Sequence, residues 1–434
     1  MISAQLFHFR KSHPTMGATY TDNFQLLRLL LSSRVELPMP KRFFIALCIM
    51  GLFAILSSTM SKSPVLNPFA QSLGTPAYLI GFVAAASTIP GILVSLPAGT
   101  ISDRVGRGKV IIFAGLIFAT APFLYLLVLD PYQLILVRFY HGFATAILVP
   151  VANATVVERY PKSRAEKVST FSSSTAVGRA IAPALGGYIL LVTLTDYHEL
   201  YIVVGITGVL ALIAAAGLRE KREPEKRPVQ KTTKELKPAE NTSKIPRSTA
   251  GEWKEVASNP RILATSLVEA AIYYTYGAFE FYLVPYAQLL GINTFLTGIV
   301  LAAEIVTFVL AKPIMGKFSD KIGRKKPIIL GLVLSGIPMV ATQFAISFPE
   351  LIMVSVTFGL GFSLVTSSTP PLISEVCRKE VYGSAMGFLG TIMDVGQALG
   401  PILTGFILAA TAMYSVSFMS LGLLLFACAI IFSL

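Results

Sequence analysis

Long apolar runs separated by short polar segments dominate the pattern of this chain. A helix that crosses a bilayer needs about 20 mostly apolar residues. The sequence predicts twelve such segments: 43–69, 77–101, 109–129, 131–157, 165–193, 198–218, 260–289, 294–316, 327–347, 350–375, 381–410 and 413–433. Several contain proline or glycine, which packed neighbours tolerate inside a membrane. We therefore predict an all-α membrane protein with twelve transmembrane helices.

The segments form two groups of six, separated by a stretch of different composition. Residues 219–258 are rich in Lys, Arg, Glu, Pro and Thr, which is typical of a largely disordered linker. Its end is predicted to become helical, with Trp253 at the membrane interface and Asn259 and Pro260 as N-cap and first helical residue. The predicted organisation is an N-terminal segment (1–40), a first six-helix bundle (41–218), the linker (219–258) and a second bundle (259–434).

The first 40 residues allow two interpretations. Phe24–Leu31 is apolar but contains Gln25 and Arg28, and no convincing cleavage site follows, which argues against a signal peptide. The segment is compatible with a short amphipathic helix on the membrane surface. Translation from Met39 would instead remove it.

Composition agrees with lipid as the solvent, and the placement of charge predicts the topology. The chain is 54% hydrophobic and 14% charged, whereas globular domains carry about 25% charged residues. The net charge of +13 would suit nucleic acid, but we place all but three of the 36 Lys and Arg on one side of the predicted membrane. The positive-inside rule then predicts a multi-pass protein of the cytoplasmic membrane, with both termini and the linker in the cytoplasm. We expect no nucleic-acid partner.

Several classes of chemistry have no support in the sequence. The three cysteines and four histidines are dispersed, without metal-binding or disulfide spacing. There is no Ser/His/Asp grouping, no HExxH and no Walker A motif. We therefore expect no metal, no cofactor, no enzymatic activity and no ATP hydrolysis by this chain.

A short basic motif occurs twice, at 99–107 and 316–324. Pro68, Gly142 and Glu158 recur at the same offset as Pro285, Gly359 and Glu375. Both halves have six spans in the same orientation, so the chain is a parallel repeat, an architecture known from transporters. The key residues of the two copies are Gly99, Asp103, Arg104, Gly106 and Arg107, then Gly316, Asp320, Lys321, Gly323 and Arg324.

These features resemble the major facilitator superfamily over about residues 41–434. The repeated segment is similar to the family's motif A, Gly-x-x-x-Asp-(Arg/Lys)-x-Gly-Arg-(Arg/Lys), with a departure at Gly108. We expect Asp103 to accept hydrogen bonds from helix N-terminal amides and Gly106 to allow a tight turn. We expect Arg107 to reach Glu158, and Arg324 to reach Glu375. We call each motif arginine with its carboxylate partners a clip. The resemblance implies that the two clips hold the halves in one access state, in which the cavity opens to one side of the membrane. The alternative is that the basic residues only fix the orientation of the helices through the positive-inside rule.

Two further segments resemble family motifs. Leu134, Arg138, His141 and Gly142 are similar to motif B, with His141 in place of the usual Gln. The resemblance links Arg138 to proton transfer; a structural arginine bonded to carbonyls is the alternative.

Helix 165–193 carries a glycine pattern similar to motif C, which is associated with antiporters, with Ala182 in place of one Gly. The residues concerned are Gly178, Pro183, Gly186 and Gly187. Small residues also let helices approach closely, and helix 381–410 carries a comparable pattern. Part of the signal therefore belongs to the repeat architecture.

Ionisable residues lie inside the predicted spans, among them Lys62, Arg138, Arg179, Glu269, Glu280, Glu304 and Asp394. Because such residues are costly against lipid, most should face a cavity or one another. In the family, helices 1, 4, 7 and 10 line the central cavity. Glu269 is therefore the first candidate for a proton or cation site, with Tyr273 and Tyr276 as the wall, and Asp394 is the second. A carboxylate satisfied by a neighbour's hydroxyl is the alternative for Glu269.

Lys62 and Glu280 are almost equivalent in the repeat and lie at matching depth. We predict an ion pair between them that closes the outer side of the cavity; the alternative is that Lys62 extends to the interface alone. Arg179 and Glu304 complete the cavity and gate candidates.

These observations predict a secondary active transporter that moves a small organic solute by alternating access, most simply by proton-coupled efflux. We expect it to act as a monomer with its solute, protons and lipid as partners. An uptake symporter or uniporter of the same fold is the alternative. A membrane enzyme lacks a catalytic constellation here, and a non-transporting sensor would lack a soluble domain. Cavity tyrosines and carboxylates suit organic cations, sugars or amino acids, so the sequence leaves the substrate open.

Overall fold

The computed structural model describes residues 39–161, 163–218, 249–378 and 381–434. These residues form helices and turns and contain no strand, which confirms the all-α prediction. Residues Phe44–Leu434 form one compact unit. The predicted surface helix Phe24–Leu31 and linker residues 219–248 lie outside the described residues.

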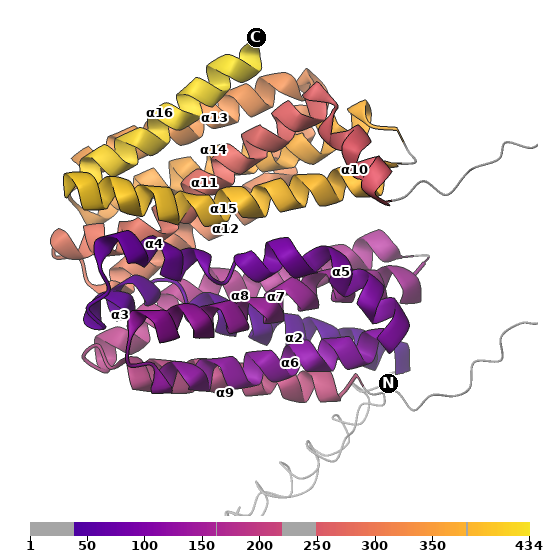
Figure 1. The fold of residues 1–434 in the computed structure, drawn as a ribbon, viewed down its shortest axis with the longest axis horizontal. Helices are drawn as coiled ribbons and strands as arrows, with labels where there is room; N and C mark the ends of the chain where they lie inside the picture. Colours follow the sequence, from indigo (N-terminus) through magenta and orange to yellow (C-terminus); the bar gives the residue numbers. More distant parts are fainter. Residues whose placement is uncertain (1–38, 162, 219–248, 379–380) are drawn as a thin grey trace, which may run out of the picture. The chain divides into compact units, whose positions relative to one another are not determined.

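The first half supplies six membrane-length passes, coloured indigo to magenta in Figure 1. Its elements are α2 (Met39–Met60), α3 (Leu66–Ser72), α4 (Ala77–Ala85), α5 (Ile89–Val105), α6 (Arg107–Leu124) with a 3₁₀ turn (Tyr125–Leu127), α7 (Pro131–Arg159), α8 (Arg164–Val192) and α9 (Tyr197–Ala216). Helices α4 and α5 together form one pass, since only the turn 86–88 separates them.

The second half repeats the arrangement after the short helix α10 (Thr249–Ala257). Asn259 caps the next helix, because its side chain accepts hydrogen bonds from the backbone amides of Arg261 and Ile262. This confirms the predicted helix start. The six helices are α11 (Pro260–Leu289), α12 (Thr294–Ile322), α13 (Lys325–Ala341) with a 3₁₀ turn (Thr342–Phe344), α14 (Phe348–Val376), α15 (Tyr382–Thr411) and α16 (Tyr414–Ser433).

Eleven helical segments of the described chain are long and apolar enough to cross a membrane. The remaining pass is α11, whose 30 residues are ample for a span. It contains Glu269, Glu280 and several tyrosines, which lower its hydropathy, and most of its residues from Val268 to Ala287 are buried. Protein neighbours rather than lipid therefore surround much of α11.

The structure corrects several predicted boundaries. The first predicted span breaks at Ser61–Val65 between α2 and α3, and Lys62 lies in this turn rather than on a helix. The second span breaks before Pro90, which follows the first residue of α5 and lacks an amide donor for the preceding turn. Helix α12 extends past the predicted end at residue 316 to Ile322.

Most of each basic motif is helical rather than a loop. Residues 99–105 complete α5 and residues 316–322 complete α12. The turn itself is made by Gly106 and Gly323, whose φ angles of 105° and 85° favour glycine. We call the end of the helices near these glycines the clip end, and the end near the α3–α4 connection the far end.

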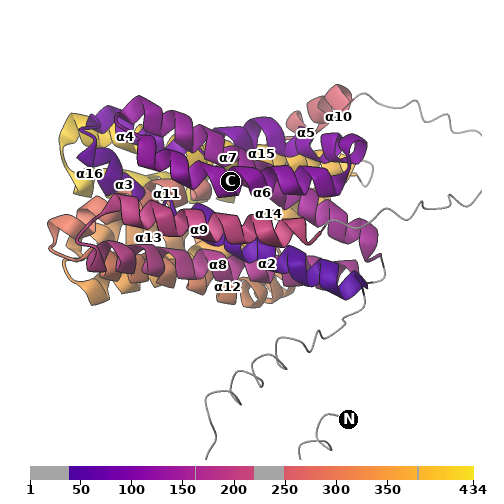
Figure 2. The same cartoon turned by 90° about the horizontal axis from the view of Figure 1, so that it is seen from below.

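The two halves pack together along two helix pairs. Helix α4 lies beside α15 (Figure 1), and α8 lies beside α12 (Figure 2). Glycines permit both contacts: a Cβ on Gly81 would lie 2.3 Å from Pro401 O, and one on Gly298 would lie 2.2 Å from Pro183 O. These contacts bring the halves together towards the far end.

Candidate functional site

A cavity of about 870 Å³ lies between the two halves. It is lined by residues from α2, α5, α7 and α8 on one side and from α11, α12, α14 and α15 on the other. Its lining extends from Lys62 and Glu280 to Asn153 near the end of α7 and Met386 in the first turns of α15. Its volume is within the range of small-molecule sites. The cavity therefore reaches from the far-end contacts into the clip-end half.

The far end of the cavity carries the ion pair expected from the repeat. Lys62 Nζ donates to Glu280 Oε2 at 2.6 Å, and the two side chains are 21% and 5% exposed. Beside it, Asn67 Nδ2 donates to the carbonyl of Phe281 at 3.1 Å and joins α3 to α11. Both contacts cross between the halves. That the pair opens and closes remains a prediction.

Arg138 on α7 is 2% exposed and lines the cavity. It donates to Ser87 Oγ at 2.5 Å, whereas its Nε has no hydrogen-bond partner among the described residues. His141, one turn further along α7, lies with its Nδ1 3.4 Å from the hydroxyl of Tyr125. The motif-B arginine is thus held by the hydroxyls of Tyr125 and of Ser87, which lies in the turn before α5, rather than by backbone carbonyls.

An aromatic wall forms one side of the cavity. Tyr273 and Tyr276 of α11 pack against Phe362 of α14. Their ring centroids lie 5.0 Å and 5.2 Å, respectively, from the ring centroid of Phe362. Phe308 of α12 packs on the same Phe362 at 5.4 Å. All four side chains line the cavity, as the sequence predicts for the two tyrosines.

Two of the candidate carboxylates lie behind the wall. Glu269 is 4% exposed, is not among the cavity-lining residues, and accepts a hydrogen bond from Thr369 Oγ1. Glu304 is 1% exposed, and both its oxygens lack a hydrogen-bond partner among the described residues. Its electrostatic neighbours are Glu280 and Lys62. The contact of Glu269 is the hydroxyl pairing that the sequence left as the alternative.

Besides Arg138, three charged side chains line the cavity without an ion pair to any described residue: Arg179, Asp394 and Lys312. The first two are sequence candidates. Lys312 was grouped with the cytoplasmic basic residues, which is wrong, because α12 continues for ten residues beyond it to Ile322. That length, about 15 Å of helix, places Lys312 well inside the membrane span.

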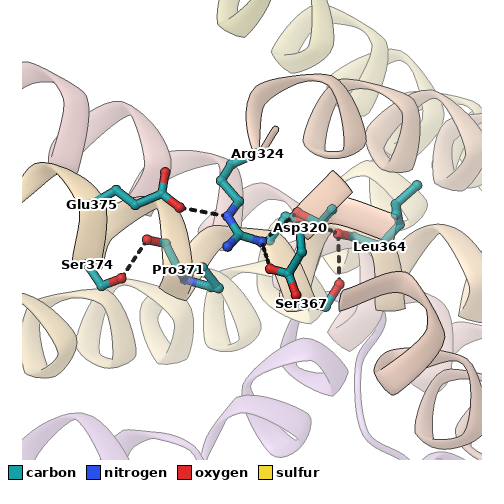
Figure 3. A network of polar contacts seen from close by, with 9 residues as sticks. Asp320, Arg324, Leu364, Ser367, Pro371, Ser374 and Glu375 are labelled. Atoms are coloured by element: carbon teal, nitrogen blue, oxygen red, sulfur yellow. Dashed lines mark hydrogen bonds and ion pairs between the residues drawn. The ribbon is translucent and has the colours of Figure 1, made fainter. Parts of the chain in front are cut away.

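The two clips have the same geometry in both halves. Arg107 bonds Glu158 at 2.5 Å and Asp103 at 2.8 Å. Arg324 bonds Glu375 at 2.9 Å and Asp320 at 2.5 Å, and Figure 3 shows its guanidinium between the two carboxylates. Hydrogen bonds to Glu375 and Asp320 raise the pKa of Arg324 above its usual value. Asp103 thus pairs with an arginine one turn away, at the C-terminal end of α5, and does not cap a helix N-terminus as expected.

The motif-C-like glycines serve close helix contacts. A Cβ on Gly178 would lie 2.4 Å from Leu52 O of α2, and one on Gly187 would lie 2.4 Å from Thr294 O of α12. Gly186 approaches Met60, and Pro183 faces Gly298. The pattern therefore joins α8 both to its own half and to the other half.

Comparison with known proteins agrees with this architecture. The family model of the Major Facilitator Superfamily matches residues 43–307 and 286–434. An uncharacterised MFS-type transporter of Methanocaldococcus jannaschii is 23% identical over 363 residues, which are 82% of this chain and 89% of that protein. A homologue of the multi-drug resistance efflux pump PmrA from Lactococcus lactis is also 23% identical over 363 residues, with 81% and 85% covered.

A solved structure with the same fold is a bacterial homologue of the human lysosomal transporter Spinster in an inward-facing, unoccupied conformation. It superposes with a TM-score of 0.72 and 17% identity, over 91% of this chain and 95% of that one. Two six-helix halves, a repeated clip and a central cavity thus occur together in a chain that the family model matches almost throughout. The protein belongs to the major facilitator superfamily and is a multi-pass membrane transporter, not an enzyme.

Proposed function

We propose that the protein is a proton-coupled exporter of a small organic solute that works by alternating access. The observation that carries the proposal is a cavity between the halves that extends towards the clip end, whereas the Lys62–Glu280 pair and the close glycine contacts join the halves at the far end. Such asymmetry is expected of one access state of a transporter whose halves move against each other around a central site.

The orientation of this state follows from the basic residues. Arg104, Arg107, Lys321 and Arg324 gather at the clip end. The positive-inside rule assigns the clip end to the cytoplasm. In this orientation the cavity accepts its solute from the cytoplasm and is closed to the outside by Lys62 and Glu280.

Proton coupling requires an ionisable group that the cavity reaches. Asp394 lines the cavity and has no ion pair with a described residue, so its charge is open to a proton or to the solute. Glu269 and Glu304 are buried outside the cavity lining and interact electrostatically with Tyr273 and Tyr276 of the wall, and Arg138 lies in the other half on α7. Ionisable residues inside membrane spans commonly serve proton relays, which makes Asp394 the first test and Glu269 the second.

Export is favoured over uptake by two observations. The relative from Lactococcus lactis is described as an efflux pump homologue, and α8 carries glycines similar to the antiporter motif. The same cavity would serve an uptake symporter or a uniporter, so the direction needs a direct measurement.

That measurement uses the full chain in proteoliposomes with a panel of labelled organic cations, neutral compounds and anions. An antiporter accumulates its solute in vesicles with an acidic lumen, because protons leave as the solute enters. Accumulation in vesicles with an alkaline lumen would identify a symporter, and accumulation that ignores the gradient would identify a uniporter. Protein-free liposomes and a protonophore are the controls. If no compound moves in a protein-dependent way, the transport proposal is contradicted.

A further inference from the structure

The charged side chains that line the cavity are predominantly cationic. Four cations, Lys62, Arg138, Arg179 and Lys312, face two carboxylates, Glu280 and Asp394. Lys62 and Glu280 pair with each other at 2.6 Å. Three cations, Arg138, Arg179 and Lys312, and one carboxylate, Asp394, therefore remain without an ion-pair partner in the cavity lining.

These three cations lack counter-ions within the described residues. Arg138 bonds only neutral hydroxyls, those of Ser87 and Tyr125, and leaves its Nε unsatisfied although it is 2% exposed. Neither Arg179 nor Lys312 has a carboxylate within 4.0 Å, the limit for an ion pair. Of the three, only Arg138 is buried; Arg179 is partly buried and Lys312 is exposed in the cavity. A buried cation without a counter-ion is costly, and the other two offer unpaired charge to whatever fills the cavity. An anionic ligand would supply the missing partner.

The surrounding carboxylates do not remove this excess. Asp394 interacts with Tyr273 at long range and forms no ion pair. Glu269 is the electrostatic neighbour of Lys312, but it lies behind the wall, where Thr369 occupies one of its oxygens. Glu304 lies near the Lys62–Glu280 pair, at the far end.

The same region offers an apolar surface beside the cations. Lys312 follows Phe308 by one helical turn, so both side chains lie on one face of α12. Phe308 packs on Phe362, which packs on Tyr273 and Tyr276. Arg179 interacts electrostatically with both tyrosines from the opposite half. Cationic donors and an aromatic wall thus meet in one space.

We propose that the cavity binds an amphipathic organic anion, whose carboxylate lies between Arg179 and Lys312 and whose apolar body lies on the aromatic wall. The inference rests on the proposed transport function of this cavity and names its substrate class. The guanidinium of Arg179 is suited to a bidentate contact with a carboxylate, and Lys312 adds a point charge from the other half.

The test uses matched ligands that differ only in the charge of the head group. Naphthyl, phenylbutyl and dodecyl bodies each carry a carboxylate, an amide or an amine, and binding to the detergent-purified full chain is measured by thermal stabilisation and by competition. We expect the carboxylates to bind most tightly and the amines least. Amines that bind as well as or better than carboxylates would overturn the proposal, as would carboxylates that bind no better than amides on all three bodies.

Variants locate the binding site. Arg179→Gln and Lys312→Gln should each weaken carboxylate binding by about tenfold to a hundredfold, the usual value of a hydrogen bond to a charged group, and leave amide binding unchanged. Lys312→Arg should retain the preference. Arg164→Gln is the matched control, since Arg164 is exposed at the start of α8 and outside the cavity. A loss of equal size for carboxylates and amides would mean a general structural effect and contradict the charge contact. Because the ligands are also tested on the unaltered chain, poor folding of a variant leaves the proposal testable.

Failure of this proposal and failure of transport give different results. Gradient-driven accumulation of a cation or a neutral compound in the proteoliposome panel, without carboxylate binding, would refute the substrate class and leave the transport function standing. Carboxylate binding without any accumulation would support the ligand site and contradict export.

Discussion

Lys62 and Glu280 come from opposite halves of the chain and meet in a 2.6 Å hydrogen-bonded ion pair at the far end of the cavity. Their depth and repeat positions point to this contact before any coordinates are known. Glu280 is 5% exposed, so removing its partner leaves a buried charge unpaired, which is more costly than removing both.

The first prediction is that this pair gates access from the far side. Lys62→Ala and Glu280→Ala should each increase labelling of a cysteine at Thr59, a cavity-lining position, by an impermeant thiol reagent added at the far side. The double variant should deviate from additivity by about 0.5–3 kcal/mol in the access equilibrium. Exchange of the two charges, Lys62→Glu with Glu280→Lys, should restore low labelling. Strictly additive effects would show that the residues do not communicate.

The second prediction concerns the clips. Asp103→Asn and Asp320→Asn each remove one of two carboxylates from an arginine near the surface, where an ion pair is worth about 0.2–1 kcal/mol. Such an amount is enough to shift the populations of two access states of similar free energy. We expect retained expression with altered labelling of the Thr59 cysteine. Glu166→Gln, which breaks the exposed Lys167–Glu166 pair within the single helix α8, should have no effect. Identical labelling in all three variants would leave the clips with a topological role only.

The third prediction separates proton coupling from the movement of solute across the membrane. Asp394→Asn should abolish gradient-driven accumulation and retain exchange of solute between the two sides, since the amide keeps the shape of the protonated acid. Glu269→Gln is the second test, and its amide oxygen can still accept from Thr369 Oγ1. Proton-driven accumulation equal to the parent in either variant removes that residue from the coupling role.

The fourth prediction concerns the glycines at the contact between the halves. Gly81→Ala and Gly298→Ala place a methyl group 2.2–2.3 Å from backbone oxygens of the other half, so the far-end contact must open. We expect increased labelling from the far side and a lower thermal midpoint. Gly108→Ala is the control, because a Cβ there meets nothing within 4 Å and alanine favours a helix. Labelling and stability equal to the parent would mean that the contact accommodates the methyl groups without opening, which contradicts the prediction.

Much of this architecture is predictable because membrane physics leaves few alternatives. Apolar length predicts the helices, and the arginine of the motif is correctly expected to reach a glutamate in each half, Glu158 for Arg107 and Glu375 for Arg324. Local pattern is less informative where helices break: proline and polar residues near Ser61 and Pro90 interrupt passes that hydropathy alone reads as continuous.

The cavity itself was only partly predictable. Lys312 escaped notice because it lies close in sequence to the basic motif, and hydropathy does not show that α12 continues to Ile322. Ser87 and Thr369 are ordinary hydroxyl residues in sequence. Only the packing of the α4–α5 pass on α7 brings Ser87 to Arg138, and only the packing of α14 on α11 brings Thr369 to Glu269. Side-chain partners across helices depend on rotation and depth, which a single sequence does not specify.

The central claim is that the two ends of the cavity open alternately, and paired spin-label distances test it most directly. One pair replaces Phe82 and Phe406, whose rings lie 6.1 Å apart on α4 and α15 at the far end; a second pair replaces Gly108 and Lys326 at the clip end. Cys48, Cys377 and Cys428 are changed to serine, and the full chain is measured in nanodiscs at acidic and alkaline pH, with and without Lys62→Ala. The account predicts two populations in which the far-end distance lengthens as the clip-end distance shortens. A single unchanging distance at both ends, or ends that open together, would contradict it.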